Sequence, residues 1–149
     1  MATILLPPDL KDFLRLLHSN AVEYLLVGGY AVGYYGYPRA TGDMDIWVAR
    51  NPTNANKVTN ALKAFGFGNA SISPALFVTP NKVFRMGNPP LRIELLTDIS
   101  GVDFAACWKS REIAVVDDVA INIINLDDLK RNKAASGRLK DKNDIAHLP

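Results

Sequence analysis

The stretch from residue 23 to residue 48, EYLLVGGYAVGYYGYPRATGDMDIWV, constrains the fold more than any other part of the chain. It opens with a short apolar run at residues 24–27, which has the length and composition of a buried strand. Gly28 and Gly29 follow, and a helix is expected over residues 30–35. Backbone N–H groups are unpaired at the N-terminus of a helix, and glycine lets an anion approach the backbone closely. The junction therefore predicts either a phosphate-binding turn or an ordinary tight turn.

The same stretch closes with two aspartates that are two residues apart. Side chains alternate between the faces of a strand, so Asp43 and Asp45 are expected on one face, roughly 6–7 Å apart at Cα. Met44 and Ile46 would then point the other way, into a core. Two neighbouring carboxylates repel each other unless a cation lies between them, and hard divalent cations prefer oxygen ligands. The pattern therefore indicates a candidate metal site.

Taken together, these features resemble the signature of the nucleotidyltransferase superfamily, which has the DNA polymerase beta-like fold. Its members combine a strand that ends in two glycines, a helix, and an Asp-hydrophobic-Asp strand. Arg39 and Thr41 precede the aspartates in an R-x-T-x-D-x-D pattern. This pattern resembles small stand-alone bacterial members, such as relatives of abortive-infection toxins and minimal nucleotidyltransferases. The resemblance implies an α+β fold, a mixed α/β arrangement in which helices flank a central mixed sheet.

A third acid is expected on a neighbouring strand. Residues 91–97, LRIELLT, read as a strand in which Arg92 and Glu94 share one face. A carboxylate among hydrophobic residues is costly to bury without a partner, so Glu94 is expected either to face water or to point toward the cation of the aspartate pair. In the superfamily a third carboxylate comes from the strand beside the Asp-x-Asp strand, and Glu94 is the matching position. A salt bridge from Glu94 to Arg92 or Arg85 is the alternative.

The resemblance also implies the chemistry of the site. Asp43, Asp45 and Glu94 would be both the catalytic residues and the ligands of two Mg²⁺ ions, with Mn²⁺ as an alternative, in a site built for in-line displacement. The reaction would move a nucleoside monophosphate from a nucleoside triphosphate such as ATP to an acceptor hydroxyl and release pyrophosphate. The residues expected to contact the nucleotide are Gly28, Gly29, Tyr30, Arg39, Thr41, Lys133, Arg138 and Lys140.

Basic residues are concentrated at the C-terminal end. The whole chain has a formal net charge of +2, whereas residues 130–149 contain six bases and two acids. This end resembles the tail of the stand-alone members, where a lysine-containing helix precedes G-R-x-K-D-x-x-D. A basic tail beside an acidic site suggests an anionic ligand that arrives with metal, such as a triphosphate. Lys133, Arg138 and Lys140 are therefore candidates to contact phosphate, and the alternative for each is a solvated surface charge.

The remaining pattern predicts the other elements. Helices are expected at residues 10–20, 52–65, 102–108 and 141–148, and another begins near residue 126. Residues 75–78 and 82–86 are expected to form a hairpin or two short edge strands. Residues 111–116 and 119–124 are expected to form two strands joined by a turn at Asp117 and Asp118. The tyrosines that follow the glycines, at positions 30, 34, 35 and 37, either pack in the core or stack on a nucleobase.

Composition limits the class of protein. The length of 149 residues predicts one domain, residues 1–149, with a basic helical segment at about 126–149. The single cysteine, Cys107, excludes an internal disulfide and suits a reducing cytosol, so a cytoplasmic location is expected. No apolar stretch has the length of a transmembrane helix, and the N-terminus does not have the pattern of a signal peptide, so no membrane partner is expected. The charge balance is too mild to indicate duplex DNA binding by itself.

The acceptor and two other functions stay open at this stage. The acceptor could be RNA such as tRNA, a protein side chain or a small hydroxylated molecule. It is expected to bind an open face, a second subunit of a homodimer, or a partner protein such as the other half of a toxin–antitoxin pair. The first alternative function is a non-catalytic nucleotide-binding protein or antitoxin-type partner with the same fold. The second is an unrelated α/β binding domain whose aspartates lie in a surface turn.

Overall fold

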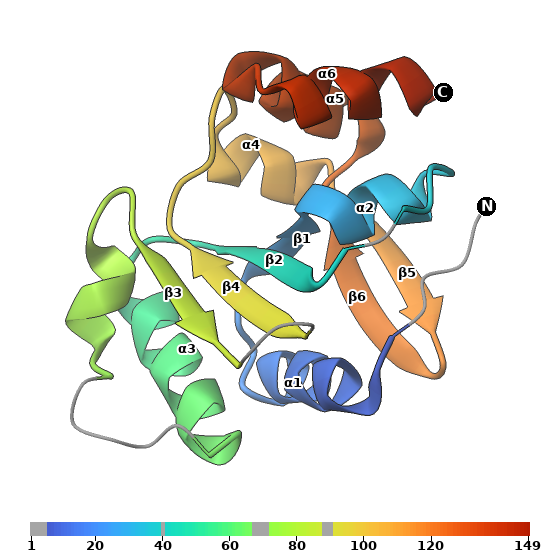
Figure 1. Ribbon diagram of the computed structural model, residues 1–149. Helices are drawn as coiled ribbons and strands as arrows, with labels where there is room; N and C mark the ends of the chain where they lie inside the picture. Colours follow the sequence, from blue (N-terminus) through green and yellow to red (C-terminus); the bar gives the residue numbers. More distant parts are fainter. Residues whose placement is uncertain (1–5, 40, 67–71, 88–90) are drawn as a thin grey trace.

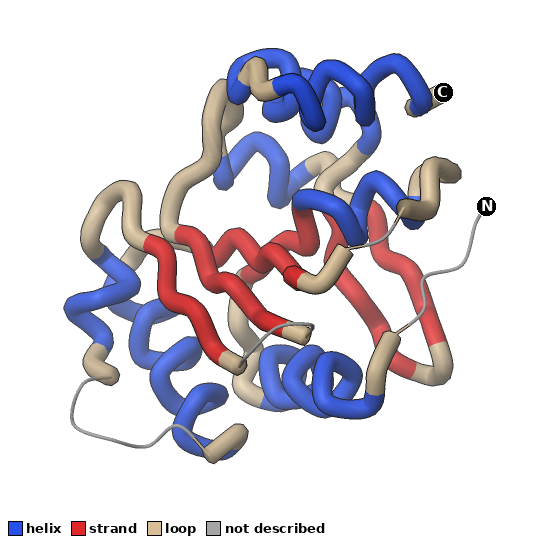
Figure 2. The backbone as a smooth tube through the Cα atoms, viewed as in Figure 1, coloured by secondary structure: helices blue, strands red, loops and turns tan. Residues whose placement is uncertain are grey.

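The computed structural model describes residues 6–39, 41–66, 72–87 and 91–149, which form a mixed six-stranded β-sheet flanked by helices (Figure 1, Figure 2). The order of strands across the sheet is β3-β4-β2-β1-β6-β5. The strands are β1 (Tyr24–Val27), β2 (Asp43–Val48), β3 (Val83–Met86), β4 (Arg92–Leu96), β5 (Glu112–Val116) and β6 (Val119–Ile123). The helices are α1 (Pro8–Ser19), α2 (Gly28–Tyr34), α3 (Pro52–Ala64), α4 (Phe104–Lys109), α5 (Leu126–Ser136) and α6 (Leu139–His147), with a 3₁₀ helix η1 (Pro74–Val78). The expected α+β fold is confirmed.

Helices cover both faces of the sheet. In Figure 1, α1 and α3 lie below the strands, and α2, α4, α5 and α6 lie above them. The central strands have apolar faces, and the helices on each side of the sheet bury these faces. Among the residues described, none of the helices has the length and hydrophobicity that crossing a lipid bilayer requires.

Strand β2 lies in the middle of the sheet and carries the aspartate pair. It runs antiparallel to β1 and parallel to β4, and the register places Asp45 opposite Glu94 and Asp43 opposite Arg92. Met44 and Ile46, on the other face of β2, are fully buried. The expected alternation along this strand is therefore confirmed, and the two predicted carboxylate-bearing strands are neighbours.

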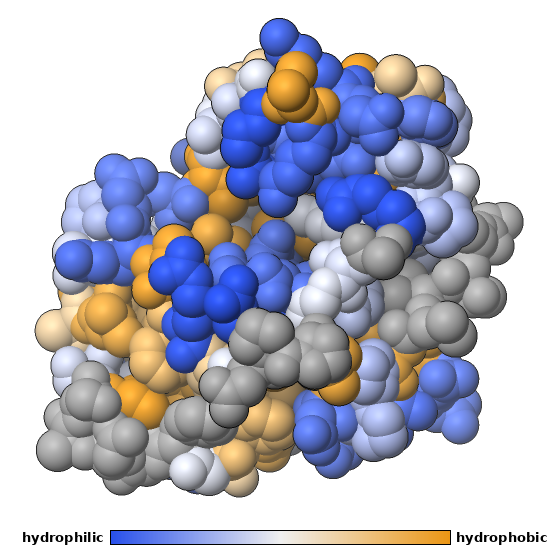
Figure 3. Space-filling model, viewed as in Figure 1, coloured by the Kyte–Doolittle hydropathy of each residue, from blue (hydrophilic) through white to orange (hydrophobic). Residues whose placement is uncertain are grey.

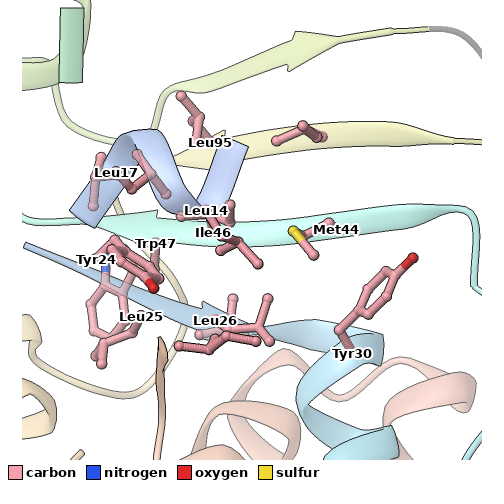
Figure 4. Close-up of a cluster of buried hydrophobic side chains, with 14 of the residues drawn as sticks. Leu14, Leu17, Tyr24, Leu25, Leu26, Tyr30, Met44, Ile46, Trp47 and Leu95 are labelled. Atoms are coloured by element: carbon pink, nitrogen blue, oxygen red, sulfur yellow. The ribbon is translucent and has the colours of Figure 1, made fainter. Parts of the chain in front are cut away.

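The core lies between the sheet and its helices. Figure 4 shows Leu14 and Leu17 of α1 packed against Leu25, Ile46 and neighbouring side chains of the central strands. At 25 cal/mol per Å² of apolar surface, burying each large aliphatic side chain of this cluster contributes about 1.5–3 kcal/mol. Central strands held this firmly give a rigid support for the polar residues at their ends.

Two local predictions need correction. Residues 75–78 are not a strand but part of η1, because Pro74 fits the first turn of a helix and the Thr79 hydroxyl donates to the carbonyl oxygen of Ala75 at 2.8 Å. Residues 83–86 alone form the expected edge strand, β3. Helix α2 begins at Gly28 rather than at Tyr30, so both glycines lie inside its first turn.

Candidate active site

Asp45 is the most unusual carboxylate of the sheet. Its Oδ1 atom is buried and has no hydrogen-bond partner within the described part of the chain. Burial, and to a smaller extent the negative charges of Glu94 and Asp43, together raise the pKa of Asp45 from 3.8 to about 6. Buried polar atoms are nearly always paired in folded proteins. A buried carboxylate oxygen without a partner is therefore a candidate ligand for a cation or a candidate acceptor for a hydrogen-bond donor.

Glu94 and Asp43 are held by arginines. Arg92 donates to both oxygens of Asp43, from Nε and from Nη2, each at 3.1 Å. The same Nη2 lies 3.5 Å from Oε1 of Glu94, which also accepts from Nε of Arg85 at 3.1 Å. The alternative interpretation of Glu94, a salt bridge to Arg92 or Arg85, is therefore what the structure contains. Glu94 also lies beside Asp45 on the adjacent strand, since the two residues are register partners.

Asp43, Asp45 and Glu94 meet some of the requirements of a divalent-cation site. Across the described ranges, no three His, Cys, Asp or Glu side chains converge into a ready-made metal site. The guanidinium of Arg92, itself a cation, bridges Asp43 and Glu94 instead. Asp43 and Asp45, with one buried unpaired oxygen, have the oxygen donors and excess negative charge that Mg²⁺ prefers.

The two glycines make room for the site. A Cβ atom on Gly28 would lie 2.3 Å from Oδ2 of Asp45, and one on Gly29 would lie 2.9 Å from Oγ1 of Thr41. Gly28 also has a φ of +66°, which side-chain-bearing residues rarely adopt. Glycine is thus required here because the Asp45 carboxylate lies directly against the backbone at the start of α2.

We expect Gly28→Ala to destabilise the protein more than Gly137→Ala does. Gly137 has nearly the same backbone angle, φ +69°, but its nearest neighbour to an added Cβ is 3.8 Å away. Both changes cost about 1–2 kcal/mol for the left-handed backbone, and only Gly28→Ala adds the overlap with Asp45. Urea unfolding of the two variants measures the difference. Equal losses of stability would show that the carboxylate moves aside freely.

A charged cleft of about 290 Å³ lies between the aspartates and the C-terminal helices. Figure 3 shows a hollow between the α5–α6 end of the molecule and the sheet, with hydrophilic surface above and below it. The sequence-predicted residues that line this cleft are Gly28, Gly29, Arg39, Thr41, Asp43, Asp45, Lys133, Arg138 and Lys140. The fold therefore brings together residues that lie more than ninety positions apart in the sequence.

Tyr30 and Glu94 are not among the residues that line the charged cleft. Tyr30 lines a second, more open cleft of about 730 Å³, together with Leu6, Leu91 and Pro38. The two clefts share Gly29, Arg39 and Thr41 as a common wall. A polar and a largely apolar cleft therefore meet at the start of α2.

Two buried aspartates of α6 hold the basic wall of the charged cleft. Asp144 accepts two bonds from Arg39, at 2.8 and 2.9 Å, and lies 3.1 Å from Nζ of Lys133. Asp141 lies 3.2 Å from the same Nζ and accepts from Nε of Arg138 at 2.7 Å. The side chains of Lys133, Asp141 and Asp144 are 4%, 0% and 1% exposed. This group of paired charges, which is called the ion cluster below, consists of Arg39, Lys133, Arg138, Asp141 and Asp144.

Opposing effects act on the acids of the ion cluster. Burial alone would raise the pKa of Asp141, but hydrogen bonds from Arg138, Ser136 and Lys133 outweigh it and leave that pKa below its usual range. The pKa of Asp144 is lowered in the same way, by Arg39 and Lys133 against burial. Both acids are therefore ionised at neutral pH, and they fix three cations at the edge of the cleft.

The tail bases divide into two kinds. Lys133 is buried in the ion cluster, so it is not the solvated surface charge that the sequence left as an alternative. Arg138 is 58% exposed at the surface, but it is paired with Asp141. Lys140 is exposed, lines the charged cleft and has no ion pair among the described residues. Its charge nevertheless reaches Asp45, where it lowers the carboxyl pKa against the larger effects that raise it.

Two of the four tyrosines that follow the glycines have structural roles. Tyr35 is buried and its hydroxyl donates to the carbonyl oxygen of Ile124 at 2.7 Å. Tyr37 stacks on His147, with ring centroids 4.1 Å apart and planes 9° from parallel. Core or surface packing thus accounts for these two rings, whereas Tyr30 alone of the three borders a cleft.

Sequence reasoning missed several residues of the site. Neither Asp141 nor Asp144 was singled out as a site residue. Asp141 also caps the last helix, because it accepts from the backbone N–H of Arg138. The bridging role of Arg92 was foreseen for Glu94 but not for Asp43. A usable signal for the ion cluster was the i, i+3 spacing of the two aspartates, which places them on one face of a helix.

Solved structures share this fold. A Thermotoga maritima protein provisionally named a nucleotidyltransferase matches with a TM-score of 0.62 over 96% of this chain and 94% of its own, at 12% identity. An antigenic nucleotidyltransferase-like protein from Paracoccidioides brasiliensis matches with a TM-score of 0.54 over 92% of this chain and 70% of its own, at 20% identity. No protein-family model and no curated protein matches the sequence. At these identities the comparisons establish that the chain has the nucleotidyltransferase fold.

Proposed function

We propose that the protein is a metal-dependent nucleotidyltransferase, which moves a nucleoside monophosphate from a nucleoside triphosphate to an acceptor hydroxyl and releases pyrophosphate. The observation that carries the proposal is the unpaired, buried oxygen of Asp45 beside Asp43 and Glu94, opposite a wall of fixed cations. Carboxylates for a cation and cations for an anion, facing each other across one cleft, are what a metal–triphosphate complex requires.

Each group has a role in this reaction. Asp43 and Asp45 would hold Mg²⁺, with Glu94 as the third ligand once its arginine partners release it. When bound, Mg²⁺ supplies charge neutralisation for the phosphate that is transferred and for the pyrophosphate that leaves. Glu94 would accept the proton of the acceptor hydroxyl as its oxygen bonds to the α-phosphorus and the bond to pyrophosphate breaks.

The basic wall would bind the leaving pyrophosphate. Lys140 has no ion pair among the described residues, so it is the first candidate in the charged cleft to contact phosphate directly. The ion cluster keeps Arg39, Lys133 and Arg138 in fixed positions. The positive electrostatic potential that they create is therefore in place before the nucleotide binds. Gly28 and Gly29 would let the phosphates approach the backbone, and the second cleft, lined by Tyr30, would take the less polar part of the nucleotide or the acceptor.

The test follows a labelled nucleoside triphosphate with Mg²⁺ into tRNA, protein and small hydroxylated molecules. We expect pyrophosphate release that depends on one of these acceptors. Asp43→Asn is expected to weaken metal-dependent nucleotide binding at least tenfold, because half of the aspartate pair is lost. Asp12→Asn, which changes an exposed carboxylate of α1, is the matched control. Unchanged nucleotide affinity in Asp43→Asn would contradict the proposal.

The competing function is a non-catalytic partner protein, such as an antitoxin-type member of a pair. It is separated by the same experiment, because it predicts nucleotide binding or stoichiometric protein binding without transfer to any acceptor. The salt bridges that hold Glu94 favour it if they persist with nucleotide bound, since they occupy the third carboxylate.

A further inference from the structure

Strand β5, at one edge of the sheet, exposes two large apolar side chains. Ile113 is 61% exposed and Val115 is 71% exposed, and the alternation of a strand places both on one face. The opposite edge strand, β3, differs: its one exposed apolar residue, Val83, is flanked by charged Lys82 and Arg85. Charges on edge strands prevent association with other sheets, and this protection is missing from the middle of β5.

The backbone of β5 is also open for pairing. A turn of two residues with positive φ, Asp117 and Asp118, joins β5 to β6, so Val116 and Val119 form the hydrogen-bonded pair that closes the hairpin. Bonded and non-bonded pairs alternate along an antiparallel ladder. Ile113 and Val115 are therefore non-bonded partners of β6, and their N–H and C=O groups point to the open edge.

We propose that a second copy of this chain pairs with β5 in antiparallel orientation, so that two sheets become continuous across a two-fold axis at Ala114. In this register Ile113 of each copy lies opposite Val115 of the other, and four β-branched side chains gather on one face. Cross-strand pairs of this kind stabilise sheets. A two-fold axis uses the same patch on both copies, as most dimers do.

Charge selects this register over its neighbours. With Ala114 on the axis, Arg111 of each copy lies opposite Asp117 of the other, at both ends of the paired segment. Moving the axis one residue toward Ile113 puts Arg111 opposite Val115, and moving it toward Val115 puts Ile113 opposite Asp117. Only the central register matches apolar with apolar and acid with base. Asp117 keeps 60% of its side chain exposed beside Lys11, so it is accessible to a second cation.

Light scattering or sedimentation equilibrium over a range of concentrations tests the proposal. The chain has a mass of 16.3 kDa, and we expect the measured mass to approach twice this value as concentration rises. Val115→Lys and Ile113→Lys are each expected to return the protein to monomer. Val83→Lys, on the other edge strand, is the matched control and should leave the dimer intact. A monomer at every concentration, or a dimer that survives both β5 changes, overturns the proposal.

A cysteine at the axis tests the register itself. Ala114 of the two copies would form a non-bonded antiparallel pair, whose Cα atoms lie about 4.5 Å apart, within the range that a disulfide spans. Oxidised Ala114→Cys is therefore expected to run as a covalent dimer on a non-reducing gel. Ala120→Cys, on β6, should still dimerise but run as a monomer on the same gel, and the native Cys107 is buried. Failure of Ala114→Cys to cross-link in a protein that still dimerises would rule out the central register.

Discussion

Asp45→Asn is expected to make the metal-free protein more stable and to abolish the proposed nucleotidyl transfer. In the folded chain, burial and the charges of Glu94 and Asp43 raise the pKa of Asp45 from 3.8 to about 6. At pH 7.5 the folded state therefore carries a carboxylate charge that is more favourable in the unfolded chain. Each pKa unit corresponds to about 1.4 kcal/mol, so removing the charge is expected to gain about 1–3 kcal/mol.

The stability of the wild type relative to Asp45→Asn is expected to fall as pH rises. Between about pH 4 and pH 6 the folded state binds more protons at Asp45 than the unfolded state does, so the wild-type protein loses stability relative to Asp45→Asn as pH rises through this window. Below about pH 4 both states are protonated and the advantage of the variant disappears. Urea unfolding at pH 7.5 and pH 4 measures both limits, with Asp12→Asn as the exposed control. A variant less stable than wild type at pH 7.5 would contradict the assignment.

Mg²⁺ should reverse the order of stabilities. A ligand that binds only the folded state stabilises it, and Asp45 is one of the two aspartates proposed to hold the ion. We expect added Mg²⁺ to raise the unfolding midpoint of the wild type and to leave that of Asp45→Asn nearly unchanged. This readout does not depend on knowing the acceptor. A rise of equal size in both proteins would mean that the ion binds elsewhere.

Asp144→Ala is expected to be the most destabilising single change of the site. It removes the partner that pairs with both Arg39 and Lys133, and Lys133 is almost completely buried. Removing one member of a buried ion pair typically costs about 3–5 kcal/mol, because the remaining charge loses compensation. Here Lys133 would keep only Asp141, which also pairs with Arg138. Denaturant unfolding measures the loss. Asp12→Ala, which removes an exposed ion pair with Arg15, is the control and should cost at most about 1 kcal/mol.

A double variant separates the two consequences of that change. If the cost of Asp144→Ala comes from the buried charge of Lys133, which would keep only Asp141 as a partner, adding Lys133→Met should recover part of the stability. It should not recover activity, because the cation at the wall of the charged cleft is then absent. Acid should act like the mutation: the pKa of Asp144 is lowered in the folded state, so its contribution is present above the ordinary carboxyl range and is lost as pH falls below it. A stable Asp144→Ala protein would show that Arg39 and Lys133 reach water.

Local patterns predicted the elements that local physics controls. The alternation of aspartates with Met44 and Ile46 defined β2 and its two faces, because the side-chain period of a strand is two. The acids at 117 and 118 predicted a turn, because Asp tolerates the left-handed conformation that both residues adopt. Prediction was wrong at residues 75–78, where the β-prone composition competes with Pro74 and the helical turn prevails.

The sequence by itself determined that Asp43 and Asp45 share one face of a strand, since this depends on neighbours within a few residues. The motif of residues 23–48 also predicted the fold class, through its resemblance to a known superfamily. Only the tertiary structure decided that Arg92 bridges Asp43 and Glu94, that Tyr30 borders a different cleft, and that Asp144 holds the cations of the charged cleft. These outcomes depend on which strands lie side by side and on which charges share a buried space. Pairings of that kind join residues up to about a hundred positions apart, and no local pattern carries them.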